Sequence, residues 1–243
     1  MDQPTEPKPK PAGKGGKGKR RSPPVEPEFR RYVALLDFDG LLCDMRPFQH
    51  ELMGPRTHEQ WRRFFSHTPQ AVPVPAGIEL ANALYRLGWR YAVSTTRPAW
   101  NGGMVGRWVR RYLPGRVEWV YASGGEGRSP AEHKRDHYVE AMVARGPVCG
   151  LFVDDDAAVV DELIEFDVPA MHIDELAGLS DADLTELLRY SVKSADARRA
   201  ELRAAARAAG VRANRDELLR TPRPRRADQA TDLSGDEPGD SPG

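Results

Sequence analysis

The stretch from Val33 to Gly40, Val-Ala-Leu-Leu-Asp-Phe-Asp-Gly, constrains the fold of this chain more than any other. An apolar run of this length, without polar alternation, is typical of a parallel strand buried on both faces. It ends in Asp37 and Asp39, and open α/β sheets bind ligands at the carboxyl ends of their strands. Because an unpaired buried charge is costly, these carboxylates predict a bound cation or a polar cradle.

Apolar strand patterns and helical patterns alternate along the chain after this run. Further strands are expected at 89–94, 117–121, 148–153 and 168–173, and helices at 58–65, 75–87, 104–113, 131–144 and from 159. This alternation predicts an α/β fold, a Rossmann-like doubly wound parallel sheet with right-handed crossovers. The short segment 44–72 predicts a small helical insert after the first strand, which leaves the crevice open.

Polar residues recur where these strands end or on the helix that follows one. They are Asp37 with Asp39, Thr95, Lys134, and Asp154 with Asp155. In a doubly wound sheet these positions converge on one crevice. Carboxylate oxygens suit Mg²⁺, which takes one or two protein carboxylates together with substrate phosphate. A hydroxyl and an ammonium group beside the ion supply a phosphoryl group with hydrogen bonds and positive charge.

Four ordered motifs, DFDG at 37–40, STTR at 94–97, Lys134 and VDDD at 153–156, resemble those of the haloacid dehalogenase superfamily of phosphotransferases. The resemblance implies that Asp37 is the nucleophile and that Asp39 is the general acid and base. It implies that Thr95 and Lys134 bind the phosphoryl group. It also implies that Mg²⁺ is held by Asp37, the Asp39 carbonyl, Asp154 and Asp155. Leu41 departs from the Thr or Val common after the DxDG glycine.

A narrower resemblance is to the 3′-phosphatase domain of polynucleotide kinase-phosphatases. It rests on the aromatic segment 58–65, Arg97 after the second motif, and Arg128 six residues before Lys134. It implies a nucleic-acid 3′-phosphate as substrate, with Arg97 as the first candidate for phosphate binding and Arg46 as a weaker one. Two rival functions stay open: a small-molecule phosphatase or nucleotidase, and a non-catalytic nucleic-acid-binding protein on the same scaffold.

The 243 residues carry no formal net charge, but the charge is unevenly distributed. We expect a disordered basic tail at 1–30, a phosphatase domain at 31–191, and an Arg/Ala-rich helical or disordered tail at 192–243 with an acidic end. The basic arms suit a nucleic-acid partner, and a solvated tail is the alternative. The segment 13–20 is similar in sequence to a phosphate-binding P-loop. It has Arg20 at the position where a P-loop needs Ser or Thr to bind magnesium, so no kinase activity is predicted.

The chain has no apolar run of membrane-spanning length and no signal-peptide pattern, so no membrane partner is expected. Its two cysteines, Cys43 and Cys149, indicate buried thiols and a cytoplasmic location.

Several residues have two open interpretations. Asp156 is a metal ligand or the N-cap of the next helix. His133 and His137 are four residues apart, which also fits zinc. Trp61, Phe64 and Phe65 stack on a base or pack on the domain. Trp100 belongs to a substrate loop or a simple turn.

Overall fold

The computed structural model describes residues 27–123, 127–144 and 146–209. In these residues five parallel strands form one sheet in the order β5-β4-β1-β6-β7. Their bounds are β1 Tyr32–Asp37, β4 Arg90–Thr95, β5 Val120–Ala122, β6 Val148–Asp154 and β7 Ala170–His172. Because β1 lies between β4 and β6, its residues are almost fully buried, as the unbroken apolar run predicts. The predicted doubly wound parallel sheet is confirmed.

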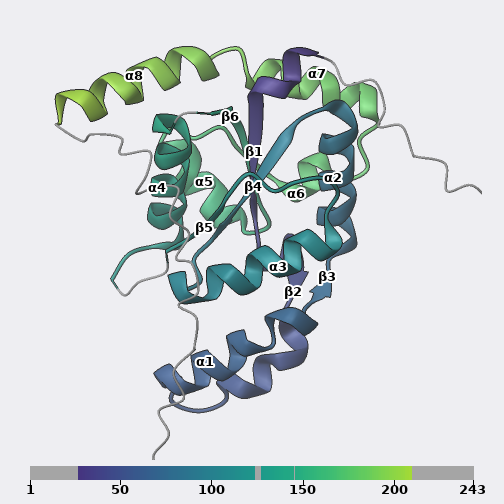
Figure 1. Cartoon of the computed structure of the whole chain (residues 1–243), viewed down its shortest axis with the longest axis vertical. Helices are drawn as coiled ribbons and strands as arrows, with labels where there is room; N and C mark the ends of the chain where they lie inside the picture. The colour runs from purple at the N-terminus through teal and green to yellow at the C-terminus, as the bar shows by residue number, and fades with distance from the viewer. Residues whose placement is uncertain (1–26, 124–126, 145, 210–243) are drawn as a thin grey trace, which may run out of the picture.

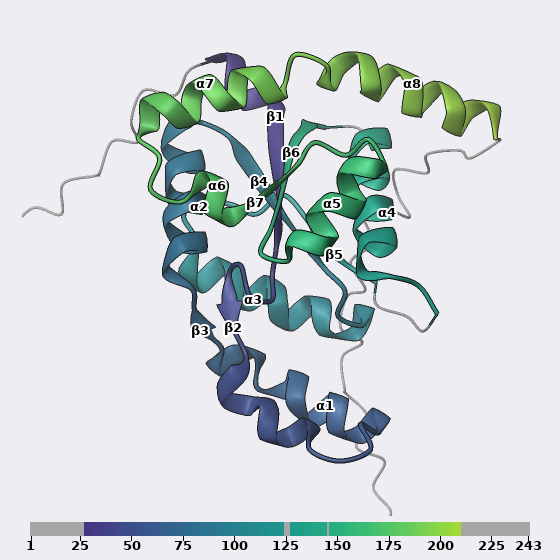
Figure 2. The same ribbon diagram turned by 180° about the vertical axis from the view of Figure 1, so that it is seen from behind.

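Helices cover both faces of this sheet (Figures 1 and 2). α2 and α3 lie on one face, and α4 and α5 lie on the other. α7 and α8 lie at the end of the sheet where the strands begin. The helix bounds are α2 Pro75–Leu87, α3 Gly102–Tyr112, α4 Pro130–Val143, α5 Ala157–Glu165, α6 Ile173–Leu176, α7 Asp181–Ser191 and α8 Ala195–Ala208; η1 (Pro27–Arg31) and η4 (Ala99–Asn101) are 3₁₀ turns.

The insert after β1 forms a lobe beyond the carboxyl end of the sheet, at the bottom of Figure 1. The two short strands β2 (Cys43–Asp44) and β3 (Val72–Pro73) pair in antiparallel fashion and form its base. Between them lie η2 (Arg46–Leu52), α1 (His58–Ser66) and η3 (Thr68–Gln70). This confirms a small helical insert, and it places the insert directly over the edge of the sheet where the ligand site is expected.

Local signals in the sequence explain where several helices begin and end. The Thr57 side chain accepts a hydrogen bond from the Gln60 backbone, and the Gln60 side chain accepts one from Thr57, so a capping box starts α1. Gly88 ends α2 in the left-handed conformation, with φ of 88°. The Asp156 carboxylate accepts hydrogen bonds from the backbone of Ala158 and Val159, which confirms the N-cap interpretation.

The Arg/Ala-rich helix α8 lies beyond the expected domain boundary at residue 191 and contacts both α4 and β6. Arg199 donates hydrogen bonds to the carbonyls of Met142, Ala144 and Gly146, and Arg203 to those of Val143 and Ala144. Two arginines of the predicted basic arm therefore bind the carboxyl end of α4. The P-loop-like segment 13–20 and the acidic end lie outside the described residues.

Candidate active site

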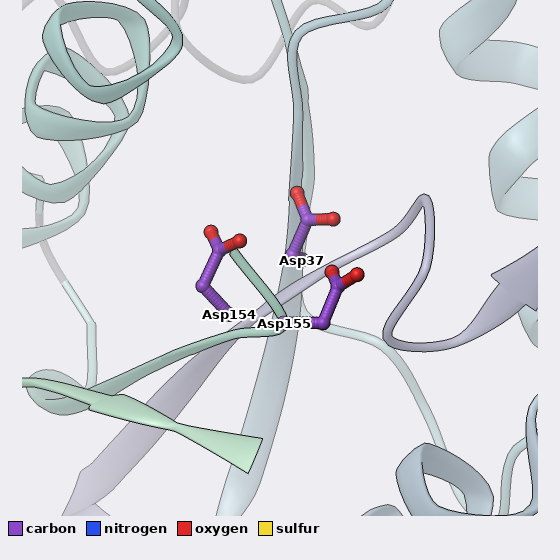
Figure 3. Close-up of side chains that lie close together, drawn as sticks. All are labelled: Asp37, Asp154 and Asp155. Atoms are coloured by element: carbon purple, nitrogen blue, oxygen red, sulfur yellow. The ribbon is translucent and has the colours of Figure 1, made fainter. Parts of the chain in front are cut away.

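Three carboxylates gather at the carboxyl end of the sheet (Figure 3). Asp37 is the last residue of β1, Asp154 is the last residue of β6, and Asp155 follows it. One oxygen from each lies within 4.8 Å of the others. The two strands are neighbours in parallel register, so their final residues meet at one edge. Residues 117 positions apart in the chain thus form a single acidic centre.

Lys134 on α4 neutralises part of this charge. Its Nζ lies 2.8 Å from Oδ1 of Asp37 and 2.6 Å from Oδ2 of Asp154. All three side chains are nearly buried. Burial alone would lower the pKa of Lys134, but the two carboxylates raise it above its usual value, so the ammonium stays charged. One lysine against three carboxylates leaves the centre with excess negative charge.

Burial and this excess charge both affect the pKa values of Asp37 and Asp155. Burial raises the pKa of Asp37 well above its usual value; Lys134 opposes this shift, and the Asp154 charge adds to it. Burial, followed by the Asp154 charge, also raises the pKa of Asp155. Both carboxylates would ionise more readily beside a divalent cation.

The donor set fits such a cation. The Lys134 ammonium contacts one oxygen of Asp37 and one of Asp154. Hard carboxylate oxygens from three side chains match the ligands that Mg²⁺ takes in proteins.

The turn after β1 lets the Asp155 side chain lie close to β1. Gly40 has φ of 87°, which favours glycine, and a Cβ at this position would lie 2.0 Å from Oδ2 of Asp155. Any larger residue would therefore push the Asp155 carboxylate aside. The glycine of the DFDG motif is required by the packing of the acidic centre itself.

Asp39 faces a different partner from the other aspartates. The guanidinium of Arg97 grips its carboxylate with two hydrogen bonds, 2.7 Å from Nε to Oδ2 and 2.6 Å from Nη2 to Oδ1. Arg97 is 1% exposed, whereas 41% of the Asp39 side chain is exposed. The Thr95 hydroxyl also lies within hydrogen-bond distance, 3.4 Å, of Oδ2 of Asp39. The fork-like pair fixes the direction in which the Asp39 carboxylate points.

Buried groups in turn hold the Arg97 side chain. Its Nη1 donates to Oγ1 of Thr68 at 2.6 Å and to Oδ1 of Asn101 at 3.0 Å. The guanidinium carbon lies 4.6 Å from the centre of the Phe38 ring and 5.0 Å from that of Phe65. Sequence reasoning missed Thr68 and Asn101, because a Thr in a 3₁₀ turn and an Asn before a helix are ordinary residues at those positions.

The predicted site residues thus form two groups. Asp37, Asp154, Asp155 and Lys134 make the acidic centre, and Thr95 and Arg97 both contact Asp39. Their roles toward a substrate stay predictions. Arg46 is exposed at the lobe and pairs with Asp44 through hydrogen bonds of 2.7 to 3.0 Å.

The zinc alternative for His133 and His137 gains no support. Nδ1 of His137 lies 2.8 Å from Oγ of Ser94, and Nε2 lies 2.5 Å from Oγ of Ser123. In the described residues the cluster of candidate metal ligands is the three aspartates. Burial lowers the pKa of His137 to about 4, so its ring is neutral at pH 7.

The aromatic residues of the insert and Trp100 of η4 differ in burial. Phe64 and Phe65 are buried in the core, as the packing interpretation predicts. Trp61 is partly buried, and Trp100, in a short 3₁₀ turn, is 44% exposed; both line a cavity next to Asp39.

None of the helices in the described residues has the length and apolar character needed to cross a membrane.

Comparison with protein-family models gave no match, and comparison with curated proteins gave none either. Among solved structures, the chain is similar to a chain of the Pnkp1/Rnl/Hen1 RNA repair complex, with a TM-score of 0.46 and 13% identity. The match covers 64% of this chain and 46% of the other, so it spans less than half of that protein.

The chain is also similar to two further solved structures. One is a haloacid dehalogenase-like family hydrolase from Streptococcus pneumoniae, with a TM-score of 0.42, 13% identity, and coverage of 58% of this chain and 83% of the other. The other is CbbY from Rhodobacter sphaeroides in complex with phosphate, with a TM-score of 0.41, 15% identity, and coverage of 58% and 84%. The proposed function rests on the geometry of the site.

Proposed function

We propose that this protein is a Mg²⁺-dependent phosphomonoester hydrolase that acts through an aspartyl-phosphate on Asp37. The observation that carries the proposal is the acidic centre, in which Asp37, Asp154 and Asp155 offer oxygens within 4.8 Å of one another and Lys134 bonds to two of them. A nucleophilic carboxylate beside a cation site and a buried ammonium is suited to accept a phosphoryl group.

The residues act in two half-reactions. An Asp37 oxygen attacks phosphorus, the bond from phosphorus to the ester oxygen breaks, and Asp39 donates a proton to that oxygen. Water then attacks the phosphorus of the aspartyl-phosphate while Asp39 accepts its proton, and Asp37 and inorganic phosphate are released. The bidentate pair with Arg97 keeps the Asp39 carboxylate oriented throughout.

Asp37, Asp154, Asp155 and the Asp39 carbonyl would hold Mg²⁺, which supplies charge neutralisation for the phosphoryl oxygens when bound. Lys134 keeps Asp37 and Asp154 together and offsets negative charge on the incoming phosphate. Thr95, at the end of β4, adds a hydroxyl to this edge of the sheet.

The preferred substrate is a 3′-phosphate end of nucleic acid. The cavity beside Asp39 and Asp155 extends under the insert lobe and has a volume of about 1120 Å³, far more than a phosphate group needs. A wide groove next to the acidic centre supports a substrate that is bulky beyond its phosphate.

The test is phosphate release from a panel of esters, measured with and without Mg²⁺. We expect hydrolysis of 3′-phosphorylated oligonucleotides to exceed that of mononucleotides and sugar phosphates. Asp37→Asn should abolish turnover with an unchanged circular dichroism spectrum, whereas Asp156→Asn, whose carboxylate caps α5, should stay active. Ordinary activity in Asp37→Asn would refute the nucleophile assignment. Salt-sensitive nucleic-acid binding without hydrolysis of any ester would support the non-catalytic rival.

A further inference from the structure

The cavity under the insert lobe has two chemically different ends. One end contains Asp39 and Asp155, of which Asp155 belongs to the acidic centre. The other end is lined by side chains of η2, α1 and η4, including Trp61, Phe65 and Trp100. A molecule bound along this cavity would therefore place a phosphate at the acidic centre and an apolar, flat group against the lobe.

At the aromatic end, the side chains of Trp61, Phe65 and Trp100 pack against one another and form one wall of the cavity. The rings of Trp61 and Phe65 stack with centroids 5.4 Å apart and planes at 23°, and Phe65 meets Trp100 edge-on at 6.0 Å. Phe65 is buried and also packs against the Arg97 guanidinium, so it ties the wall to the group that holds Asp39. The wall and the catalytic residues therefore keep a fixed relative position.

Trp100 is the member of this wall that offers an open surface. It is 44% exposed, although tryptophan is among the side chains that gain most from burial. It follows Arg97 by three residues, on the turn η4 whose Asn101 bonds to Arg97. An indole held at this place, on the wall of a cavity, is positioned to cover a flat ring of the ligand.

Basic side chains also line the aromatic end of the cavity. Arg46 and Arg56, exposed residues of the lobe, line the cavity, and Arg46 is paired there with Asp44. A nucleobase stacks on aromatic side chains, and guanidinium groups bind the phosphates of the neighbouring nucleotides. Apolar peptides and acyl chains would match the tryptophans but would make no use of the Arg56 guanidinium.

We propose that Trp100, together with Trp61, forms a stacking site for the base of the 3′-terminal nucleotide of a nucleic-acid strand, and that this contact selects the substrate. The inference rests on the proposed function, since it assumes that the terminal phosphate lies at Asp37. The phosphates upstream of the terminal nucleotide would then face Arg46 and Arg56.

Binding to the Asp37→Asn protein, measured by calorimetry with Mg²⁺ at fixed low salt, tests this site without turnover. The ligands are a 3′-phosphorylated pentanucleotide, the same strand with an abasic terminal residue, and a nucleoside 3′-monophosphate. We expect the terminal base to improve the Kd about ten-fold, since stacking contacts of this kind have that size. The pentanucleotide should bind more tightly than the mononucleotide.

Trp100→Ala in the same background should reduce the advantage of the terminal base to less than about two-fold, and Trp100→Phe should restore most of it. Tyr190→Ala is the matched control, because Tyr190 is 72% exposed on α7, away from the cavity. An advantage that persists in Trp100→Ala would overturn the stacking site. Equal affinity for pentanucleotide and mononucleotide would overturn the assignment to a strand end.

Hydrolysis by the active protein separates this inference from the proposed function. Trp100→Ala should raise the KM of the base-containing strand and leave that of the abasic strand nearly unchanged. Base-dependent, Trp100-dependent binding without any hydrolysis would refute the proposed function and leave the stacking site standing. Hydrolysis that is equally fast on the base-containing and abasic strands, in both the parent and the Trp100→Ala protein, would refute the stacking site and leave the proposed function standing.

Discussion

Arg97 and Asp39 form a bidentate ion pair in which the arginine is buried and the aspartate is half-exposed to the cavity. The arginine is anchored from behind by Thr68 and Asn101, whereas the carboxylate has an open side. The pair therefore fixes the position and direction of the Asp39 carboxylate. This arrangement gives Arg97 a second interpretation besides phosphate binding, namely positioning of the proposed general acid.

Arg97→Lys separates these two roles. A lysine keeps the charge but loses the fork, so the Asp39 carboxylate loses its fixed direction. If positioning dominates, kcat should fall about 100-fold, the size of a typical general-acid contribution, with a small change in KM. If Arg97 mainly binds substrate phosphate, the loss should fall on KM instead. Arg90→Lys at the other end of β4 is the control and should retain full activity.

Lys134→Met tests the balance of charge in the acidic centre. Removing the ammonium leaves Asp37 and Asp154 buried side by side, so we expect a loss of about 3 kcal/mol in the free energy of unfolding without metal. Urea unfolding measures this loss, and saturating Mg²⁺ should restore part of it. Arg110→Gln on the exposed side of α3 should change stability little. A Lys134 variant as stable as the parent would show that the carboxylates need no internal cation.

Addition of Mg²⁺ should stabilise the protein through the acidic centre. At a concentration one hundred times the Kd, binding to the native state alone contributes about 2.7 kcal/mol. Asp155→Asn should remove most of this stabilisation in a thermal unfolding experiment. Asp156→Asn should keep it, because that carboxylate caps α5 and asparagine is an equally good N-cap. Equal losses in both variants would argue against the assigned ligand set.

His137 should make stability depend on pH. Burial lowers its pKa to about 4, so between pH 4 and 6.5 the unfolded state binds more protons than the native state. The contribution of the neutral His137 ring to the free energy of unfolding is therefore fully present above pH 6.5 and is lost as the pH falls toward 4. The total is on the order of 3 kcal/mol.

His137→Gln should flatten this part of the curve of unfolding free energy against pH. Arg110→Gln, at an exposed position of α3 whose guanidinium does not titrate in this range, should leave the slope unchanged. A His137→Gln protein with the parental slope would disprove the neutral buried ring.

Much of this structure could be predicted because its signals are local or periodic. The unbroken apolar run of β1 and the alternation of strands and helices fix the sheet, and the order of parallel strands then brings Asp37 to Asp154 and Asp155. Asp156 could be interpreted as a cap because an N-cap involves only the next three residues.

The remaining features depend on contacts distant in sequence. Cys43–Asp44 pairs with Val72–Pro73, but each strand is too short to show a pattern. The site likewise brings Arg97 to Thr68, 29 residues away, which no spacing rule connects. The exposure of Trp100 depends on the position of the insert lobe, and no local sequence pattern predicts that position.

The hydrogen bonds from Arg199 and Arg203 to the last carbonyls of α4 have a practical consequence for anyone shortening this protein. Those carbonyls have no partners within their own helix, and the same helix carries Lys134 two to three turns earlier. A fragment that ends at residue 194 would leave these carbonyls without the arginine hydrogen bonds. The carboxyl end of α4 would then be less stable, and Lys134 would be held less firmly. Expression trials that seek a minimal active piece should therefore retain the chain through Ala208.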